Sequence, residues 1–174
     1  MNPKRILLAL ISVVSMFYIG CSISGPAHAN GTAQQSDDKP KQVKIGGIQW
    51  YVDYDAALKV AKEKKKPIWL HFGENPGWAG CRQFASGPLQ DKKIVKASKD
   101  FVPVFVDTLS DLKTTKRFGE NYGSYPVLRM HNLSGKEIGG RIDGNRVAGR
   151  IPVDTMVAQF KQAKEKFASM QESK

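Results

Sequence analysis

Cysteine is scarce in this chain: among 174 residues only Cys21 and Cys81 are cysteines, and they lie far apart. This scarcity excludes the disulfide-stapled scaffold of small secreted proteins. The sequence also lacks a glycine-rich phosphate loop, a zinc-ligand spacing, a Ser-His-Asp set and the interleaved aromatic and basic residues of nucleic-acid binders. We therefore expect no cofactor, no metal and no nucleic acid among its ligands.

The N-terminus has the pattern of an export signal. Lys4 and Arg5 precede an uncharged apolar run over residues 6–19, which is shorter than the ~20 residues that span a bilayer. Cleavage after Ala29 would remove a signal peptide of residues 1–29. Cleavage before Cys21, in the lipoprotein-like "YIGC", would instead remove residues 1–20 and leave Cys21 acylated as a membrane tether. Both routes predict a protein of the periplasm or cell envelope, and both leave Cys81 as its single free thiol.

The rest of the chain divides into a polar segment and one domain. Residues 30–46 predict a flexible linker, and residues 47–170 predict a single domain of ordinary size. The net charge is +11, or +9 without the two basic residues of the export signal. The excess positive charge lies in runs such as residues 62–66, which we interpret as a solvated face. Attraction to anionic lipid headgroups or to an acidic partner is the alternative.

Strand and helix patterns alternate through the domain. Apolar runs predict strands over residues 48–52, 68–72 and 101–107, followed by a hairpin of residues 126–131 and 137–142. Helical periodicity predicts helices over residues 53–66, 78–87, 89–98, 109–118 and from 152 onward. The order β-α-β-α-β-α-β-β-α predicts a mixed sheet with helices on both faces.

Several features together resemble the exported domains of the thioredoxin-like superfamily: the element order, the loop after "IWLHF", the "SYP" before a hairpin and the lead-in that ends "KKKP". The resemblance covers residues 48–167 and implies an α/β three-layer sandwich. In that family the loop carries Cys-x-x-Cys, in which the first thiol attacks and the second resolves the mixed disulfide. Here "WAGC" resembles that motif, with Trp78 in the attacking position, Cys81 in the resolving position, and Ala79 and Gly80 between them.

An indole cannot replace a sulfur in disulfide exchange, so ordinary dithiol turnover should be absent. One interpretation is an accessory module that binds a protein or peptide client through Trp78, Ala79, Gly80, Tyr125 and Pro126. The resemblance implies that Pro126 is a cis-proline and that Tyr125 offers its backbone to an extended peptide. The alternative is a monothiol redox protein, in which the lone thiol forms mixed disulfides or reacts with peroxide. Whether the chain is an enzyme stays open.

Other polar residues near the loop carry weaker hypotheses. His71, Met130 and His131 suggest a copper site, because imidazole and soft sulfur suit copper. A copper carrier of this family would be expected to keep two cysteines, so we interpret the three as packing and solvated polar residues. Glu74 and Asp107 could transfer protons near the thiol, but they fit ordinary loop and strand-end carboxylates better.

Overall fold

A computed structural model describes residues 39–75, 77–121, 126–144 and 150–172. The expected signal peptide, Cys21, most of the expected linker and Tyr125 lie outside these ranges. Within them, no helix combines the length and the apolar character needed to cross a bilayer.

The described residues form six strands and five α-helices with one short 3-10 helix. The strands are β1 (Gln42–Ile45), β2 (Ile48–Tyr51), β3 (Ile68–Gly73), β4 (Val102–Asp107), β5 (Val127–His131) and β6 (Ile142–Asp143). The helices are α1 (Tyr54–Lys64), α2 (Ala79–Ser86), η1 (Pro88–Gln90), α3 (Lys92–Ser98), α4 (Leu112–Arg117) and α5 (Val153–Glu172).

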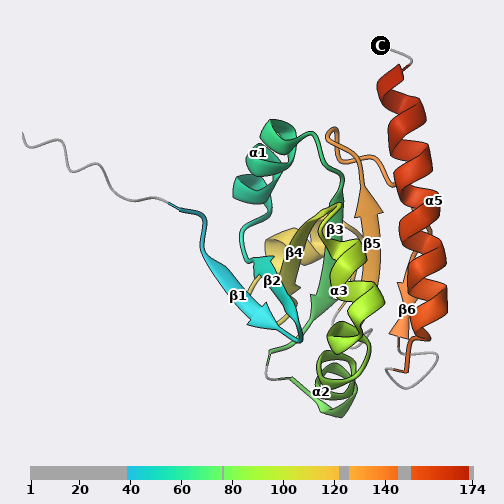
Figure 1. The fold of residues 1–174 in the computed structure, drawn as a ribbon. Coiled ribbons are helices and arrows are strands. Elements are labelled where there is room, and N and C mark those ends of the chain that lie inside the picture. Colours follow the sequence, from blue (N-terminus) through green and yellow to red (C-terminus); the bar gives the residue numbers. More distant parts are fainter. Residues whose placement is uncertain (1–38, 76, 122–125, 145–149, 173–174) are drawn as a thin grey trace, which may run out of the picture. The chain divides into compact units, whose positions relative to one another are not determined.

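One mixed sheet organises these elements, in the order β1-β2-β4-β3-β5-β6. Strands β2, β4 and β3 run parallel to one another, whereas β1, β5 and β6 each pair antiparallel with their neighbours. Every residue of β3 is buried, as expected for the central strand of a sheet covered on both faces. The structure confirms the predicted α/β architecture (Figure 1).

Each face of the sheet has its own apolar core. Because side chains alternate along a strand, Trp69 of β3 joins a core that includes Phe84 of α2 and Phe160 of α5. Its neighbour Leu70 joins the opposite core, where Ala57 of α1 packs. The two cores explain why β3 is apolar at almost every position.

Polar caps set the helix boundaries that the sequence indicates. Asp53 precedes α1, and its Oδ1 accepts a hydrogen bond from the Ala56 amide at 2.7 Å. At the other end Lys65 adopts a left-handed conformation with φ of 51°, and Pro67 follows. Asp91 and Asp111 cap α3 and α4 in the same way.

The structure corrects the sequence prediction at two places. Strand β1 falls within residues 30–46, which we expected to be linker, and it pairs with β2 across the two-residue turn Gly46-Gly47. Its four residues are too short a run to signal a strand by themselves. The strand expected over residues 137–142 is reduced to β6 and one bridge between His131 and Glu137, because two glycines interrupt that segment.

The turn between β1 and β2 offers a test of this hairpin. Gly46 has φ of +63°, and a Cβ there would lie 2.5 Å from the Leu89 Cβ. Gly119 has a similar φ of +69° with nothing within 4 Å of its Cβ position. We expect Gly119→Ala to lower the free energy of unfolding by about 1–2 kcal/mol through backbone strain alone. Gly46→Ala should cost a further ~1–3 kcal/mol from overpacking. Urea unfolding of both variants measures the difference, and equal losses would contradict the packing of this turn on Leu89.

Candidate functional site

The loop after β3 turns sharply before α2 begins. Gly77 has φ of +57°, and a Cβ at this position would lie 2.3 Å from the Glu74 carbonyl oxygen. Only glycine fits such a close approach of backbone. The Arg82 guanidinium donates a hydrogen bond to the Gly77 carbonyl, which fastens the loop to the helix. The turn therefore places Trp78 at the N-cap position of α2.

Trp78 lies back over the first turn of its own helix. A Cβ on Gly80 would lie 2.8–2.9 Å from two carbons of the Trp78 ring, so the indole needs a glycine beneath it. The Trp78 side chain also acts on the Cys81 thiol, whose pKa it lowers. Even so, 39% of Trp78 remains exposed, and Ala79 beside it is also exposed. Trp78 is thus both a cover for the thiol and an exposed apolar surface.

Cys81 is a buried free thiol, with 4% of its surface exposed. It is the third residue of α2 and lies in the first turn of the helix. Burial raises the pKa of the thiol, and the nearby Glu74 carboxylate adds to this effect. The Glu74 backbone N–H, the Trp78 indole and the charge of Arg82 oppose it without cancelling it. Cys81 is therefore a weak nucleophile at neutral pH.

An open cavity of about 310 Å³ lies beside the thiol, lined by His71, Glu74, Asn75, Cys81 and Arg82 among others. The His71 ring lies 5.2 Å from each of the Trp50, Phe84 and Phe105 rings. Neither ring nitrogen of His71 has a hydrogen-bond partner among the described residues. Burial lowers the pKa of His71 to about 3, so this imidazole is neutral at physiological pH.

Pro126 lies at the same edge of the sheet as the thiol loop. In the antiparallel pairing of β3 with β5, Phe72 is opposite Val127, so Pro126 comes next to Gly73, where the loop begins. Pro126 is buried, and its carbonyl accepts a hydrogen bond from the Gly144 amide at 2.7 Å. That carbonyl is therefore already paired within the fold. Tyr125, the residue expected to bind peptide backbone, is outside the described residues.

The weaker candidates do not assemble into sites. His71 packs among rings on one face of the sheet, while the His131 ring lies 4.9 Å from Phe118 on the other. In the described part of the chain, no group of three or more His, Cys, Asp or Glu residues could hold a metal ion. Glu74 does adjoin the thiol. Asp107 instead caps its own turn, where its Oδ1 accepts a hydrogen bond from the Leu109 amide at 3.0 Å.

Sequence reasoning missed two exposed leucines beside this loop. Leu109 and Leu112 follow β4 and are each 52% exposed. Because Gly73 of β3 is opposite Asp107 of β4 in a parallel pair, the loops that follow both strands emerge at one edge of the sheet. A second cavity, of about 350 Å³, has walls from both loops and from β1. No signal in the sequence distinguishes these leucines from core residues of a helix.

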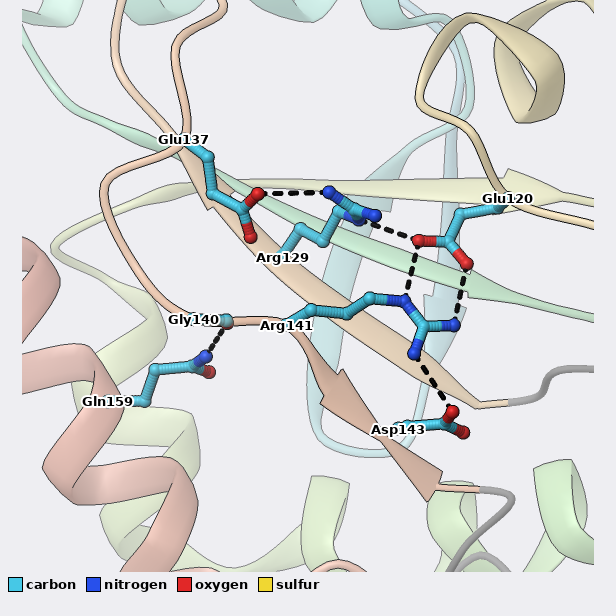
Figure 2. Close-up of polar contacts among 7 residues, drawn as sticks. All are labelled: Glu120, Arg129, Glu137, Gly140, Arg141, Asp143 and Gln159. Atoms are coloured by element: carbon cyan, nitrogen blue, oxygen red, sulfur yellow. Dashed lines mark hydrogen bonds and ion pairs between the residues drawn. The ribbon is translucent and has the colours of Figure 1, made fainter.

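Sequence reasoning also missed a charged network that links Glu120, in the segment after α4, to residues in and between the last two strands (Figure 2). The Glu120 side chain is 2% exposed and accepts hydrogen bonds from Arg141 on both oxygens, at 2.9 and 2.8 Å. Arg129 of β5 donates to the same carboxylate at 2.6 Å and also to Glu137 at 3.0 Å. Arg141 further donates to Asp143 at 2.9 Å. The network thus connects Glu120 with Arg129, the two residues that flank the segment containing Pro126.

The charge state of Glu120 follows from these contacts. Burial raises the pKa of the carboxyl, but the hydrogen bonds and charges of Arg141 and Arg129 outweigh it and hold the pKa below its ordinary value. Glu120 is therefore ionised at neutral pH. A buried bidentate arginine pair of this kind fixes geometry as well as charge.

Comparison with known proteins agrees with the fold. A family model described as thioredoxin-like matches residues 49–132. A structure described as DsbH oxidoreductase is 19% identical over 74% of this chain and 94% of its own, with a TM-score of 0.53. A thioredoxin from Thermus thermophilus is 16% identical over 70% of this chain and 91% of its own, with a TM-score of 0.56. The first thioredoxin domain of mouse protein disulfide-isomerase A4 is 17% identical over 76% and 86%, with a TM-score of 0.52. No curated protein sequence matches.

The Glu120 network predicts a pH-dependent stability. Glu120→Gln should lower the free energy of unfolding at neutral pH by about 2 kcal/mol, because Arg129 and Arg141, which are both partly in solvent, lose charged hydrogen bonds to a buried carboxylate. The folded pKa of Glu120 is lowered, so its contribution is complete above the unfolded pKa of about 4.3 and is lost as the pH falls through the folded value. Urea unfolding should show the gap between wild type and variant closing at acid pH. The exposed Glu63→Gln serves as the control, and a gap independent of pH would refute the role of the carboxylate charge.

The cover over Cys81 predicts slow alkylation. Peptide mass spectrometry of iodoacetamide-treated folded protein should show Cys81 labelled at least ~10-fold more slowly than in urea, with no inflection below about pH 8.5. Trp78→Ala should accelerate labelling, because it removes the indole that lies over Gly80 and contacts the sulfur. Leu112→Ala, also at an exposed apolar residue, should leave the rate unchanged. Fast labelling of the wild type below neutral pH would mean that Cys81 is a reactive thiolate.

Proposed function

We propose that this chain, which belongs to the thioredoxin-like superfamily, is an exported binding module that holds an extended segment of a client polypeptide. The client would lie across the edge of the sheet where β3 and β4 end. In this proposal Trp78 provides an apolar contact in place of the attacking sulfur, and the scaffold is used for recognition rather than disulfide exchange.

One observation carries the proposal. The large apolar side chains that remain exposed in the described ranges are Trp78, Leu109 and Leu112, and all three follow the carboxyl ends of adjacent parallel strands. Exposed apolar residues gathered at one edge are typical of interaction sites. Aromatic residues in particular tend to dominate binding energy.

The cavities at this edge suit an extended ligand. Asn75 lines both the cavity beside Cys81 and the cavity beneath the loop after β4, so the two adjoin. A polypeptide lying along them would pass Trp78, then Asn75, then Ser110. The side chains of the polypeptide would contact apolar surface, and neighbouring polar groups could hydrogen-bond to its backbone. Ala79, Gly80 and Tyr125 remain part of the proposed contact surface, as does Pro126 beneath it.

Chemistry at the thiol is disfavoured by its surroundings. Cys81 is the only cysteine among the described residues and is buried with a raised pKa. Dithiol exchange requires a second sulfur to release the mixed disulfide, and Trp78 provides none. A chain with this arrangement is better suited to binding than to turnover.

A monothiol function is the second candidate, and it has one specific observation in its favour. The Glu74 backbone and the Trp78 side chain both lower the pKa of the Cys81 thiol, although burial outweighs them. These two groups would stabilise a thiolate, and small oxidants could reach it through the adjoining cavity. The raised pKa makes this the weaker proposal, and the alkylation experiment above discriminates between the two.

The cellular location is part of the same proposal. The basic start and apolar run of residues 1–19, followed by Cys21 and Ala29, favour export with either signal-peptide or lipoprotein processing. Mass spectrometry of the mature N-terminus would separate the two routes, since only the second leaves an acylated Cys21.

Client binding can be tested with a permanently unfolded polypeptide whose cysteines are blocked by iodoacetamide, which adds no charge. Trp50 and Trp69 are fully buried, so acrylamide quenching of the fluorescence reports mainly on Trp78. We expect the polypeptide to protect this fluorescence from quenching. Binding measured by anisotropy should weaken about 5- to 30-fold in Trp78→Ala and in Leu112→Ala, the usual range for a contact residue at the centre of an interface.

The matched control is Lys59→Ala, an exposed position on α1 away from the proposed surface. It should bind as wild type does. Unchanged binding in both the Trp78 and the Leu112 variants would refute the proposed surface, whatever the affinity of the wild type.

A further inference from the structure

A second surface lies at the opposite end of the sheet, where β3 and β4 begin. Helices α1 and α3 both end there, because each leads directly into one of these parallel strands. In Figure 1 the connection from α1 to β3 passes over the end of the sheet away from α2. Six lysines occupy these two helix ends, and we call them the basic pole: Lys62, Lys64, Lys65, Lys66, Lys96 and Lys99.

The charges of the basic pole are not neutralised within the fold. None of its six lysines forms an ion pair with another described residue. The only contact recorded for their amines is the bond from the Lys66 amine to the Lys99 carbonyl oxygen, at 2.7 Å. Of the two carboxylates within these helix ends and their connections to β3 and β4, Asp100 is bonded to Lys164 and Glu63 is exposed.

Helix stability alone does not account for the number of unpaired lysines in the basic pole. Cations near a helix C-terminus interact favourably with the helix dipole, but the effect falls off within the last turn. Lys62 and Lys64 in the last turn of α1, and Lys96 in the last turn of α3, already provide this favourable interaction with the helix dipole. Lys65, Lys66 and Lys99 extend the positive surface beyond the helices. Lys64, Lys66 and Lys99 also line one cavity of about 440 Å³.

The type of cation indicates the type of partner. The basic pole contains lysine only: in the described ranges no arginine lies on α1, on α3 or on the segments that connect them to the next strand. Arginine provides fixed, bidentate recognition of individual carboxylates and phosphates, whereas lysine is a mobile point charge. Mobile point charges suit a surface whose anions are themselves mobile, such as the headgroups of a fluid bilayer.

We propose that the basic pole docks on anionic phospholipid headgroups. The apolar run near the N-terminus would bring the chain to a membrane, and the pole then sets its orientation there. The edge that carries Trp78 and Leu112 faces away from the bilayer in this arrangement. This inference goes beyond the proposed client binding and uses none of the same residues.

The test measures binding of the full chain to phosphatidylglycerol vesicles by co-sedimentation. In the pole variant, four exposed lysines are replaced with glutamine: Lys62, Lys64, Lys96 and Lys99. The control variant loses the same charge from four exposed lysines elsewhere: Lys41, Lys44, Lys113 and Lys116. Each juxtamembrane lysine contributes about fivefold to binding, so we expect the pole variant to bind at least ~10-fold more weakly than the control variant. Because both variants keep the same N-terminus, any contribution from the apolar run cancels.

The difference between the variants should disappear at about 1 M salt, where surface charges are screened, and on neutral phosphatidylcholine vesicles. Amine footprinting of the wild type on phosphatidylglycerol should show the pole lysines protected relative to Lys44 and Lys113. Equal binding by the two variants, or equal labelling of both groups, would overturn the proposal. Binding to soluble polyglutamate without binding to vesicles would likewise overturn it, in favour of an acidic polypeptide partner.

Discussion

The pairing of β3 with both of its neighbours determines where the candidate site of this protein lies. All six residues of the strand are buried, and its register is fixed against β4 on one side and β5 on the other. A slip of one residue would move Trp69 to the opposite face of the sheet and exchange the two cores. The same register brings the loops after β3 and β4 to one edge and places Pro126 beside them. The candidate surface is thus a consequence of the core rather than an independent feature.

The arrangement of Trp78, Gly80 and Cys81 shows how a thiol can become a packing residue. The indole lies across the glycine, and the thiol next to it is 4% exposed. A buried cysteine behaves as a small apolar side chain. The same indole leaves part of its ring in solvent, so one residue both packs beside the thiol and leaves apolar surface exposed.

The sequence predicted the fold because its strands are buried on both faces. Runs such as residues 68–72 are apolar throughout, and that pattern leaves few alternatives once helices alternate with strands. By contrast, the shortening of the final hairpin at its glycines and the formation of the short strand β1 depend on partners distant in sequence. For the site, the position of Trp78 at the start of α2 could be expected from "WAGC", but the roles of Trp78, Cys81 and Pro126 stay predictions. The exposure of Leu112 and the shared contacts of Glu120 could not be derived from sequence, because both depend on which side chains lie opposite them in the folded chain.

The two buried histidines have a consequence for the conditions under which the fold persists. Burial, the largest influence on each, lowers the pKa of His71 to about 3 and that of His131 to about 4, whereas an imidazole in the unfolded chain takes up its proton near pH 6.5. Below that pH the unfolded chain therefore binds more protons than the folded one, and mild acid draws the equilibrium toward unfolding. The two histidines therefore make the folded domain more stable at neutral pH than in mild acid.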